Sequence, residues 1–252
     1  MRIGGSLGKS LEVKDFEEIP DELDFIEFPL GEMENPPGEI DVEAINKILE
    51  EKDLDVTVHL PFRQPIVTTV KEFNQAEIDY LTRIVEKAVE FDAEKVVLHP
   101  NIRYGEETDM TEDLKKQLSH LDRACDERDI ELCVENMPDP VPTFINNFEL
   151  AEMLEELNIS MCFDTGHGFS SMGKEDMELF LKEFGHNISH LHLQDTREGK
   201  DLHLPIGSSE IDFEGVSDAL GEFEGTACME IFTESRDYIL LSKRKVEEQF
   251  GQ

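Results

Sequence analysis

The chain has 252 residues and carries 23 Lys and Arg against 59 Asp and Glu, a formal net charge of −36 at pH 7. This length suits a single α/β barrel and allows a large core without disulfides. So acidic a chain repels nucleic-acid backbones at ordinary salt, and no apolar run reaches the roughly 20 residues that span a bilayer. The acids are spread over the predicted helix faces, so we expect the solvated acidic surface of a halophilic, salt-rich cytoplasm.

The N-terminus begins directly in a strand-like run, Met1-Arg2-Ile3-Gly4-Gly5, and lacks the layout of a signal peptide. The cysteines form no close pair, and three of them lie in apolar strand-like runs; they are Cys125, Cys133, Cys162 and Cys228. We interpret them as buried thiols in a reducing compartment. We therefore expect a cytoplasmic protein without a membrane partner, while the sequence leaves the oligomeric state unknown.

Strand-like and helix-like patterns alternate along the whole chain. The predicted strands are Arg2–Gly5, Asp24–Phe28, Val56–His59, Lys95–His99, Glu131–Glu135, Ser160–Asp164, Ser189–His192 and Ala227–Ile231. The predicted helices are Val42–Glu51, Gln75–Phe91, Thr111–Arg128, Phe148–Leu157, Met177–Phe184, Phe213–Phe223 and Arg236–Phe250, with at most a short helix within Leu7–Ile19. Asn74 and Asp212 are predicted to cap the helices that follow them.

Eight strands alternating with helices favour an α/β fold, a single (β/α)8 TIM barrel that takes up residues 1–252 as one domain. A doubly wound open sheet is the alternative. It would not need eight strands, and no Gly-rich nucleotide loop follows the first strand.

In such a barrel the chemistry lies where strands end and loops begin. The run Met161–Gly168 shows the pattern best, because an apolar strand ends in Asp164 and His167 follows three residues later. Gly166 and Gly168 are expected to let the backbone turn tightly there. His, Asp or Glu also stand at the ends of the neighbouring strands or in the loops after them, namely His59, His99, Glu135, His190, His192, Asp201, His203 and Glu230.

Each of these residues alone has an ordinary structural explanation, and Asp201 with His203 could simply form a turn. Together they would bury so many carboxylates in one barrel mouth that something must neutralise them. A divalent metal is the simplest neutraliser. His190 is either a partner of a ligand or a barrel-interior residue, and His120 and His186 are expected on the surface.

Three motifs make the chain resemble the xylose isomerase-like TIM-barrel superfamily: Asp164-Thr165-Gly166-His167, His192-Leu193-Gln194-Asp195, and Asp201–Gly207 followed by Ile211-Asp212-Phe213. The resemblance covers nearly the whole chain. That superfamily contains sugar and sugar-phosphate isomerases and epimerases, inosose dehydratases, and the endonuclease IV family of DNA repair enzymes.

The isomerase and epimerase branch implies one divalent ion, such as Mn, Mg or Co, held at the positions of Glu135, Asp164, His192 and Glu230. The ion would chelate two oxygens of an open-chain sugar or sugar phosphate and stabilise an enediolate. Glu135 and Glu230 would be the catalytic base and acid, and His167 would orient the substrate. This is the favoured function.

The endonuclease IV branch implies up to three Zn ions and an AP endonuclease of base-excision repair, with DNA as its partner. The first ion would take His59, His99 and Glu135, and the second would take the four residues of the isomerase set. The third would take His167, Asp201 and His203.

Three features favour the isomerase over the nuclease. The surface is acidic, and few basic residues stand in the loops that would meet DNA, the candidates being Arg63, Arg103, Arg197 and Lys200. Phe62 is a poor match to the wedge with which the repair enzymes open a duplex. Related isomerase-like proteins also carry the extra His and Asp residues. Separately, Gly207-Ser208-Ser209 could bind phosphate before the next helix, although an ordinary connection is the better interpretation.

Overall fold

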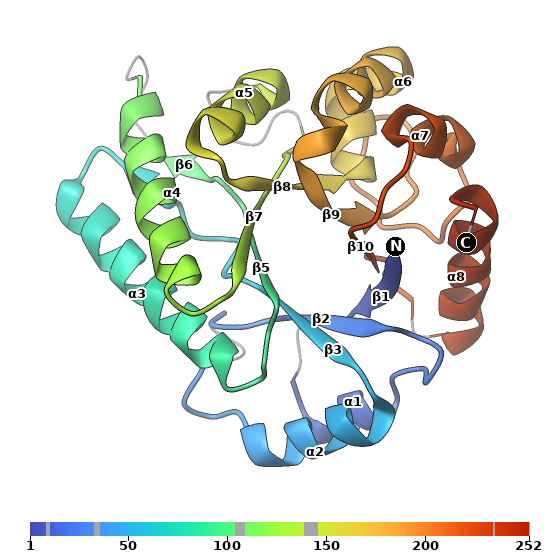
Figure 1. The fold of residues 1–252 in the computed structure, drawn as a ribbon, viewed down its shortest axis with the longest axis horizontal. Helices are drawn as coiled ribbons and strands as arrows, with labels where there is room; N and C mark the ends of the chain where they lie inside the picture. The colour runs from blue at the N-terminus through green and yellow to red at the C-terminus, as the bar shows by residue number, and fades with distance from the viewer. Residues whose placement is uncertain (9–10, 33–35, 104–108, 139–145, 234, 252) are drawn as a thin grey trace.

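The computed structural model, which describes residues 1–8, 11–32, 36–103, 109–138, 146–233 and 235–251, confirms the (β/α)8 TIM barrel. Eight parallel strands close into a ring in the order β1, β10, β9, β8, β7, β5, β3, β2 (Figure 1). Their bounds are β1 Arg2–Ser6, β2 Phe25–Pro29, β3 Asp55–His59, β5 Lys95–Leu98, β7 Glu131–Glu135, β8 Ser160–Asp164, β9 Ile188–Leu193 and β10 Thr226–Met229. The open-sheet alternative is therefore wrong.

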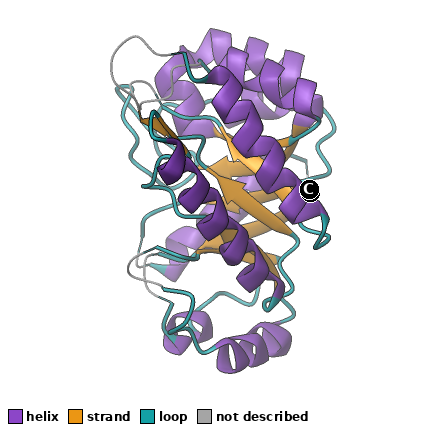
Figure 2. Ribbon diagram, turned by 90° about the vertical axis from the view of Figure 1, so that its left-hand side faces the viewer, coloured by secondary structure: helices purple, strands orange, loops and turns teal. Residues whose placement is uncertain are grey.

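Helices surround this ring of strands on the outside (Figures 1 and 2). They are α1 Val13–Glu17, α2 Val42–Lys52, α3 Lys71–Val89, α4 Thr111–Asp126, α5 Asn147–Leu157, α6 Thr165–Phe184, α7 Phe213–Leu220 and α8 Arg236–Gln249, with a short 3-10 helix at Gly185–Asn187. Two short strands, β4 (Val67–Thr68) and β6 (Ile102–Arg103), pair with each other apart from the barrel.

The main apolar core lies between the strands and the helices. Phe28 of β2 illustrates it, because its ring packs edge-on against Phe16 of α1 at 5.4 Å and against Phe91 at 5.2 Å between centroids. All three side chains are at most 3% exposed. Burying a phenylalanine contributes about 1.5–3 kcal/mol, so this layer fixes the strands whose other face forms the barrel interior.

Two predicted helix starts are wrong. Helix α3 begins at Lys71, and Asn74 lies inside its first turns, where its side chain bonds the backbone N of Thr68 at 2.7 Å. Helix α6 begins at Thr165, well before Met177, because the Asp164 carboxylate caps it and only a kink at Gly173 (φ 72°) interrupts it. The predicted cap at Asp212 is confirmed by its bond from the N–H of Gly215 at 3.1 Å.

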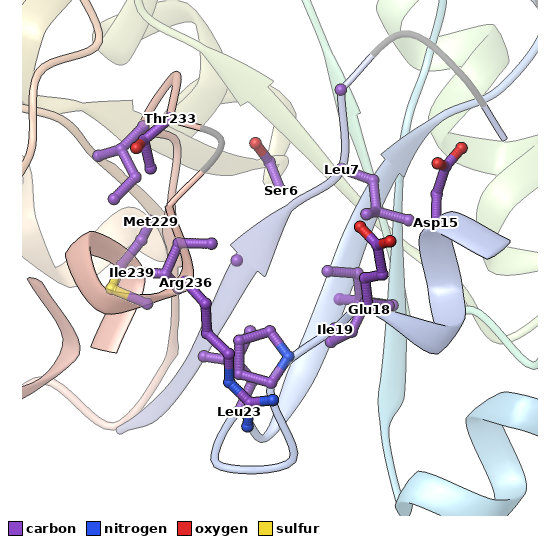
Figure 3. A pocket seen from close by; sticks show the side chains of 15 residues that line it. Ser6, Leu7, Asp15, Glu18, Ile19, Leu23, Met229, Thr233, Arg236 and Ile239 are labelled. Carbon is purple, nitrogen blue, oxygen red and sulfur yellow. The ribbon is translucent and has the colours of Figure 1, made fainter. Parts of the chain in front are cut away.

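All four cysteines are buried and unpaired, as predicted. None of the helices in the described part of the chain combines the length and apolarity that a membrane span requires. A cavity of about 640 Å³ lies on the outer side of β1. There Asp15, Glu18 and Ile19 face Arg236 and Ile239 (Figure 3), and none of the predicted site residues lines this hollow.

Candidate metal centre

The candidate ligands converge around the carboxylate of Glu135, at the end of β7. Its Oε2 lies 3.0 Å from Nε2 of His99 and 3.4 Å from Nε2 of His59. The His59 ring is held from its other side, where Nδ1 lies 2.8 Å from the carbonyl oxygen of Leu60. His59, His99 and Glu135 offer ligand atoms that all lie within 4.8 Å of one another. These three side chains are therefore close enough to share one cation.

A second group contains Glu135, Asp164, His192 and Glu230, whose ligand atoms also lie within 4.8 Å of one another. The strand register explains their convergence, because β8 and β9 pair Asp164 with His192, and β9 and β10 pair His192 with Cys228. Glu230 stands two residues after Cys228 and shares its face. Nδ1 of His192 lies 3.2 Å from Oε2 of Glu230 and 3.4 Å from Oε2 of Glu135. Glu135 thus belongs to both groups.

The remaining candidates, His167, Asp201 and His203, lie at the outer edge of the centre. Oδ2 of Asp201 is 3.5 Å from Nε2 of His167, and Oδ1 is 3.1 Å from Nε2 of His203. His203 has a left-handed backbone (φ 47°), which is uncommon for a residue with a side chain and recurs at functional sites. Nδ1 of His167 lies 3.0 Å from Oε1 of Glu135, which joins this set to the other two. The structure therefore brings all nine predicted ligands into one cluster.

Unpaired buried atoms show that the cluster fits a cation. Glu135 and His192 are fully buried, yet neither carboxylate oxygen and neither ring nitrogen makes a hydrogen bond of acceptable geometry. Buried polar groups without partners are costly and rare. A divalent ion would give the Glu135 oxygens and Nδ1 of His192 a partner, and mixed imidazole and carboxylate donors suit zinc and similar first-row cations.

The charges of the cluster also fit a bound cation. Burial disfavours the ionised form of Glu135, but His99 and His192 outweigh it and hold the pKa of that carboxyl well below its ordinary value. Burial, aided by Glu135 and Glu230, raises the pKa of Asp164 to about 6. Burial disfavours the imidazolium of His203, but Asp201 and Glu230 prevail and raise its pKa to about 9. The carboxylates require nearby positive charge, which either imidazolium groups or metal ions can supply.

Two amide side chains that sequence reasoning missed hold the carboxylates in place. Oδ1 of Asn136 accepts from the N–H of Asp164 at 2.6 Å, and its Nδ2 donates to the carbonyl of the same residue at 3.0 Å. Nε2 of Gln194 lies 3.1 Å from Oδ2 of Asp164 and 2.9 Å from Oδ1 of Asp201. The side-chain oxygen Oε1 of Gln194 accepts from the backbone N–H of His203 at 2.8 Å. Their only signals in the sequence are that Asn136 directly follows the candidate ligand Glu135 and that Gln194 lies within the motif His192-Leu193-Gln194-Asp195.

The glycines after Asp164 act through their small size. Gly166 and Gly168 lie in the first turn of α6, and neither has a positive φ. A Cβ on Gly166 would stand 2.5 Å from Cδ of Gln194, and one on Gly168 would stand 2.5 Å from Cζ of Phe163. The backbone does turn directly from β8 into α6, but without a positive φ at either glycine, and Gly166 leaves the space that Gln194 fills.

A cavity of about 190 Å³ opens over the candidate ligands. Its lining includes Phe62 and Phe232, and these rings contact the histidines below. Phe62 packs edge-on against His59 at 5.6 Å between centroids, and Phe232 stacks on His203 at 4.0 Å while staying 69% exposed. The cavity is a small hollow with imidazole and carboxylate walls and two aromatic rings.

The other histidines fall into two classes. His120 and His186 are exposed, as predicted, and His186 pairs with Glu155 at 2.8 Å. His190 is fully buried and its Nε2 lies 3.0 Å from Oε2 of Glu27, a residue that sequence reasoning missed. His190 is thus an interior residue one step removed from the candidate ligands.

Three of the four basic candidates have side chains that the structure describes. Arg63 lies over the ring of Phe62 at 5.2 Å. Arg197 and Lys200 are exposed, and Lys200 pairs with Glu198 at 2.7 Å. The side chain of Arg103 lies outside the described residues.

The Gly207-Ser208-Ser209 segment forms an ordinary connection. Asp195 is fully buried and accepts from the N–H groups of Ser209 at 2.6 Å and Ile211 at 3.1 Å. The carboxylate of Asp212 caps α7. The chain's own carboxylates therefore occupy amides that a phosphate would need.

Comparisons with known proteins agree with this architecture. The family model described as xylose isomerase-like TIM barrel matches residues 21–250, which confirms the resemblance seen in the motifs. Uncharacterized protein MJ1614 of Methanocaldococcus jannaschii is 28% identical over 197 residues, covering 76% of each chain. A probable endonuclease 4 of Staphylococcus saprophyticus is 28% identical over 210 residues, 75% of this chain and 70% of its own. A D-tagatose 3-epimerase-like protein shares the fold with a TM-score of 0.83 at 21% identity, over 100% of this chain and 97% of its own.

Proposed function

Because the chain belongs to the xylose isomerase-like TIM-barrel family, we propose that it is a divalent-metal-dependent isomerase or epimerase of a sugar or sugar phosphate. The observation that carries the proposal is the buried group Glu135, Asp164, His192 and Glu230 beneath a cavity of about 190 Å³. Cavities that hold drug-sized ligands measure roughly 300–1,000 Å³, so this one favours a smaller substrate. The structural likeness to an epimerase-like protein is consistent with this choice.

The chain's own residues divide the work in this proposal. Glu135, Asp164, His192 and Glu230 would hold the ion, which when bound supplies Lewis-acid stabilisation of developing oxyanion charge. Glu135 and Glu230 approach the same atom, Nδ1 of His192, to 3.4 and 3.2 Å, so both carboxylates lie beside one edge of this imidazole. We assign them the removal and the return of a carbon-bound proton. The Glu230 side chain is 19% exposed and lines the cavity, so it can exchange its proton with solvent.

His167 suits the role of orienting the substrate. It lines the cavity, and its Nδ1 is held by the carbonyl of Asn136 at 2.9 Å. Phe62 and Phe232 offer apolar faces to the carbon-bound hydrogens of a sugar at the same opening.

Incorporation of solvent deuterium tests the proposal directly. The protein is loaded with Mn, Co or Zn and incubated in deuterium oxide with a panel of aldoses, ketoses and their phosphates. We expect deuterium at a single carbon of one sugar, and at least a roughly 100-fold loss of exchange in Glu135→Gln and Glu230→Gln. Glu131→Gln, which changes a carboxylate at the opposite end of the barrel, should retain exchange. Absence of exchange across the panel would overturn the proposal.

A trinuclear zinc phosphodiesterase that acts at abasic sites in DNA is the second candidate. The specific observation in its favour is that five more candidate ligands adjoin the first four. His59, His99 and His167 approach the Glu135 carboxylate, and Asp201 lies between His167 and His203. The probable endonuclease 4 relative supports the same choice.

Metal stoichiometry separates the two candidates. The isomerase should hold about one ion per chain after purification without chelator, whereas the nuclease should hold up to three zinc ions. His203→Gln should leave the count unchanged in the first case and remove one ion in the second. Cleavage of an abasic-site duplex by the wild type, abolished in Glu135→Gln, would reverse the order of preference.

A further inference from the structure

We propose that Glu27, which is not among the nine predicted ligands, is a positioning residue that orients His192 toward the metal. The inference rests on the proposed metal centre. Glu27 lies within β2, and its side chain is 2% exposed inside the barrel. A carboxylate so deeply buried is retained only if it has partners. Its partners are two histidines, and one of them is a candidate ligand.

Glu27 divides its oxygens between these two imidazoles. Oε1 lies 2.9 Å from Nε2 of His192, and Oε2 lies 3.0 Å from Nε2 of His190. His190 is anchored on its other side, where Nδ1 lies 2.6 Å from Oγ1 of Thr226. Thr226 and His190 are register partners on neighbouring strands. The contacts therefore form a buried chain from Thr226 through His190 and Glu27 to His192.

These contacts leave only Nδ1 of His192 available to a metal ion. Because Nε2 faces Glu27, Nδ1 faces the candidate metal group, 3.2 Å from Glu230 and 3.4 Å from Glu135. Metal-binding imidazoles commonly donate their second N–H to a carboxylate, which fixes the ring and makes the ligating nitrogen more basic. The Glu27 contact is close but lies off the hydrogen-bond axis, so a small ring rotation would complete it.

Direct ligation by Glu27 is the competing possibility. Glu27, His59 and His192 offer ligand atoms within 4.8 Å of one another. However, each oxygen of Glu27 already faces an imidazole N–H position, whereas both oxygens of Glu135 lack a hydrogen bond. We therefore assign Glu27 to the support of His192, and the number of bound ions distinguishes the two roles.

The test is the cobalt affinity of Glu27→Gln, which keeps the shape of the side chain and removes its charge. Affinity is measured by competition with a chromophoric chelator, and the visible absorption of bound Co²⁺ reports the ligand field. We expect about 10–100-fold weaker binding, an altered Co²⁺ spectrum and an unchanged number of ions per chain. Glu131→Gln is the matched control and should bind cobalt like the wild type.

A double-mutant cycle shows whether Glu27 acts through His192. In a His192→Ala background, Glu27→Gln should change cobalt affinity by less than about twofold, because the residue that it positions is gone. An equally large effect in both backgrounds, or wild-type affinity in Glu27→Gln, would overturn the inference. Loss of one ion per chain would also overturn it, by making Glu27 a ligand.

Two further readouts keep failures separable. If the wild type binds no divalent metal, the proposed function fails; if it binds metal and Glu27→Gln binds equally well, only this inference fails. Circular dichroism in the presence of chelator checks that the variant folds. Should it not fold, Glu27→Asp replaces it, because this shorter carboxylate cannot reach both imidazoles. Glu27→Asp should weaken cobalt binding at the same ion count, and wild-type affinity would contradict the inference.

Discussion

Replacing Gln194 by leucine would remove the support beneath the candidate centre. The Gln194 side chain is fully buried; its amide contacts the carboxylates of Asp164 (3.1 Å) and Asp201 (2.9 Å), and its carbonyl accepts from the N–H of His203 (2.8 Å). Leucine has a similar size and makes none of these bonds. A buried polar group left without a partner costs about 1–3 kcal/mol. Three groups lose one, and Asp201 counts for less because its side chain is 37% exposed. We expect the free energy of unfolding of the chelator-treated protein to fall by about 2–5 kcal/mol.

Added divalent metal should return part of that loss, because a cation bound at Asp164 replaces the donor that this carboxylate has lost. Urea unfolding with chelator and with zinc measures both values. Gln117→Leu is the matched control, since Gln117 is a buried glutamine of α4 whose amide bonds the backbone carbonyls of Ile66 (3.2 Å) and Asn74 (2.8 Å). Its loss should not depend on metal. A loss for Gln194→Leu below about 0.5 kcal/mol, or one that metal leaves unchanged, would refute the reasoning.

Three further predictions concern stability. Gly166→Ala should lower the free energy of unfolding by about 1–3 kcal/mol, because the new Cβ would meet Gln194. Gly38→Ala is the control, since a Cβ there would meet nothing within 4 Å, and it should leave stability almost unchanged. Thermal melting compares the two variants. Burial of Glu131 opposes ionisation, but hydrogen bonds from Lys95, Ser160 and Ser189 outweigh burial and hold the pKa of this carboxyl below its ordinary value. The ionised carboxylate therefore contributes stability above pH 4.5, and this contribution is lost as the pH falls through the folded-state pKa. Because the Glu131 side chain is 39% exposed, solvent screens its ion pair, and Glu131→Gln should cost about 1 kcal/mol or less at pH 7. The loss should be smaller near pH 3 in urea unfolding, and equal losses would contradict this. The net charge of −36 predicts that melting temperature rises from low to molar KCl, and full stability at low salt would count against it.

The barrel and the convergence of the candidate ligands could be predicted because both depend on local order in the sequence. Alternation places every second side chain of a strand on the inner face, and a closed parallel barrel brings all carboxyl ends to one mouth. His59 and Glu230 therefore belong to the same cluster although they lie far apart in the sequence. The helix starts were harder to predict, because a polar side chain can either cap a helix or bond another group, and local patterns do not show which partner it takes. The Asn74 side chain bonds Thr68 instead of capping a helix, and Asp164 caps α6 while also standing among the candidate ligands.

Glu27 escaped prediction for a different reason. An acid within the apolar run Phe25-Ile26-Glu27-Phe28 has no partner nearby in the sequence, and His190 stands 163 positions away. Only the closure of the barrel brings β2 within reach of the side chains of β9. The role of Gly166 was equally hidden, because the atom that a Cβ would meet belongs to Gln194 on a neighbouring strand's end.

The polar character of the barrel interior ties these observations together. At the amino end Lys95 pairs with Glu131, and Nζ of Lys95 lies 3.3 Å from Oγ of Ser189, which in turn lies 3.3 Å from Sγ of Cys133. TIM barrels usually fill this space with branched apolar side chains, whereas here the main apolar cluster lies between strands and helices. Beneath Glu135 and Asp164 lies only a small apolar cluster of Val97, Cys133 and Cys162, and the other interior groups named here are polar. Thr226 and His190 lie one layer below His192, and Glu27 connects them to the candidate centre because it contacts both His190 and His192. The centre is organised along the barrel axis as well as around its rim.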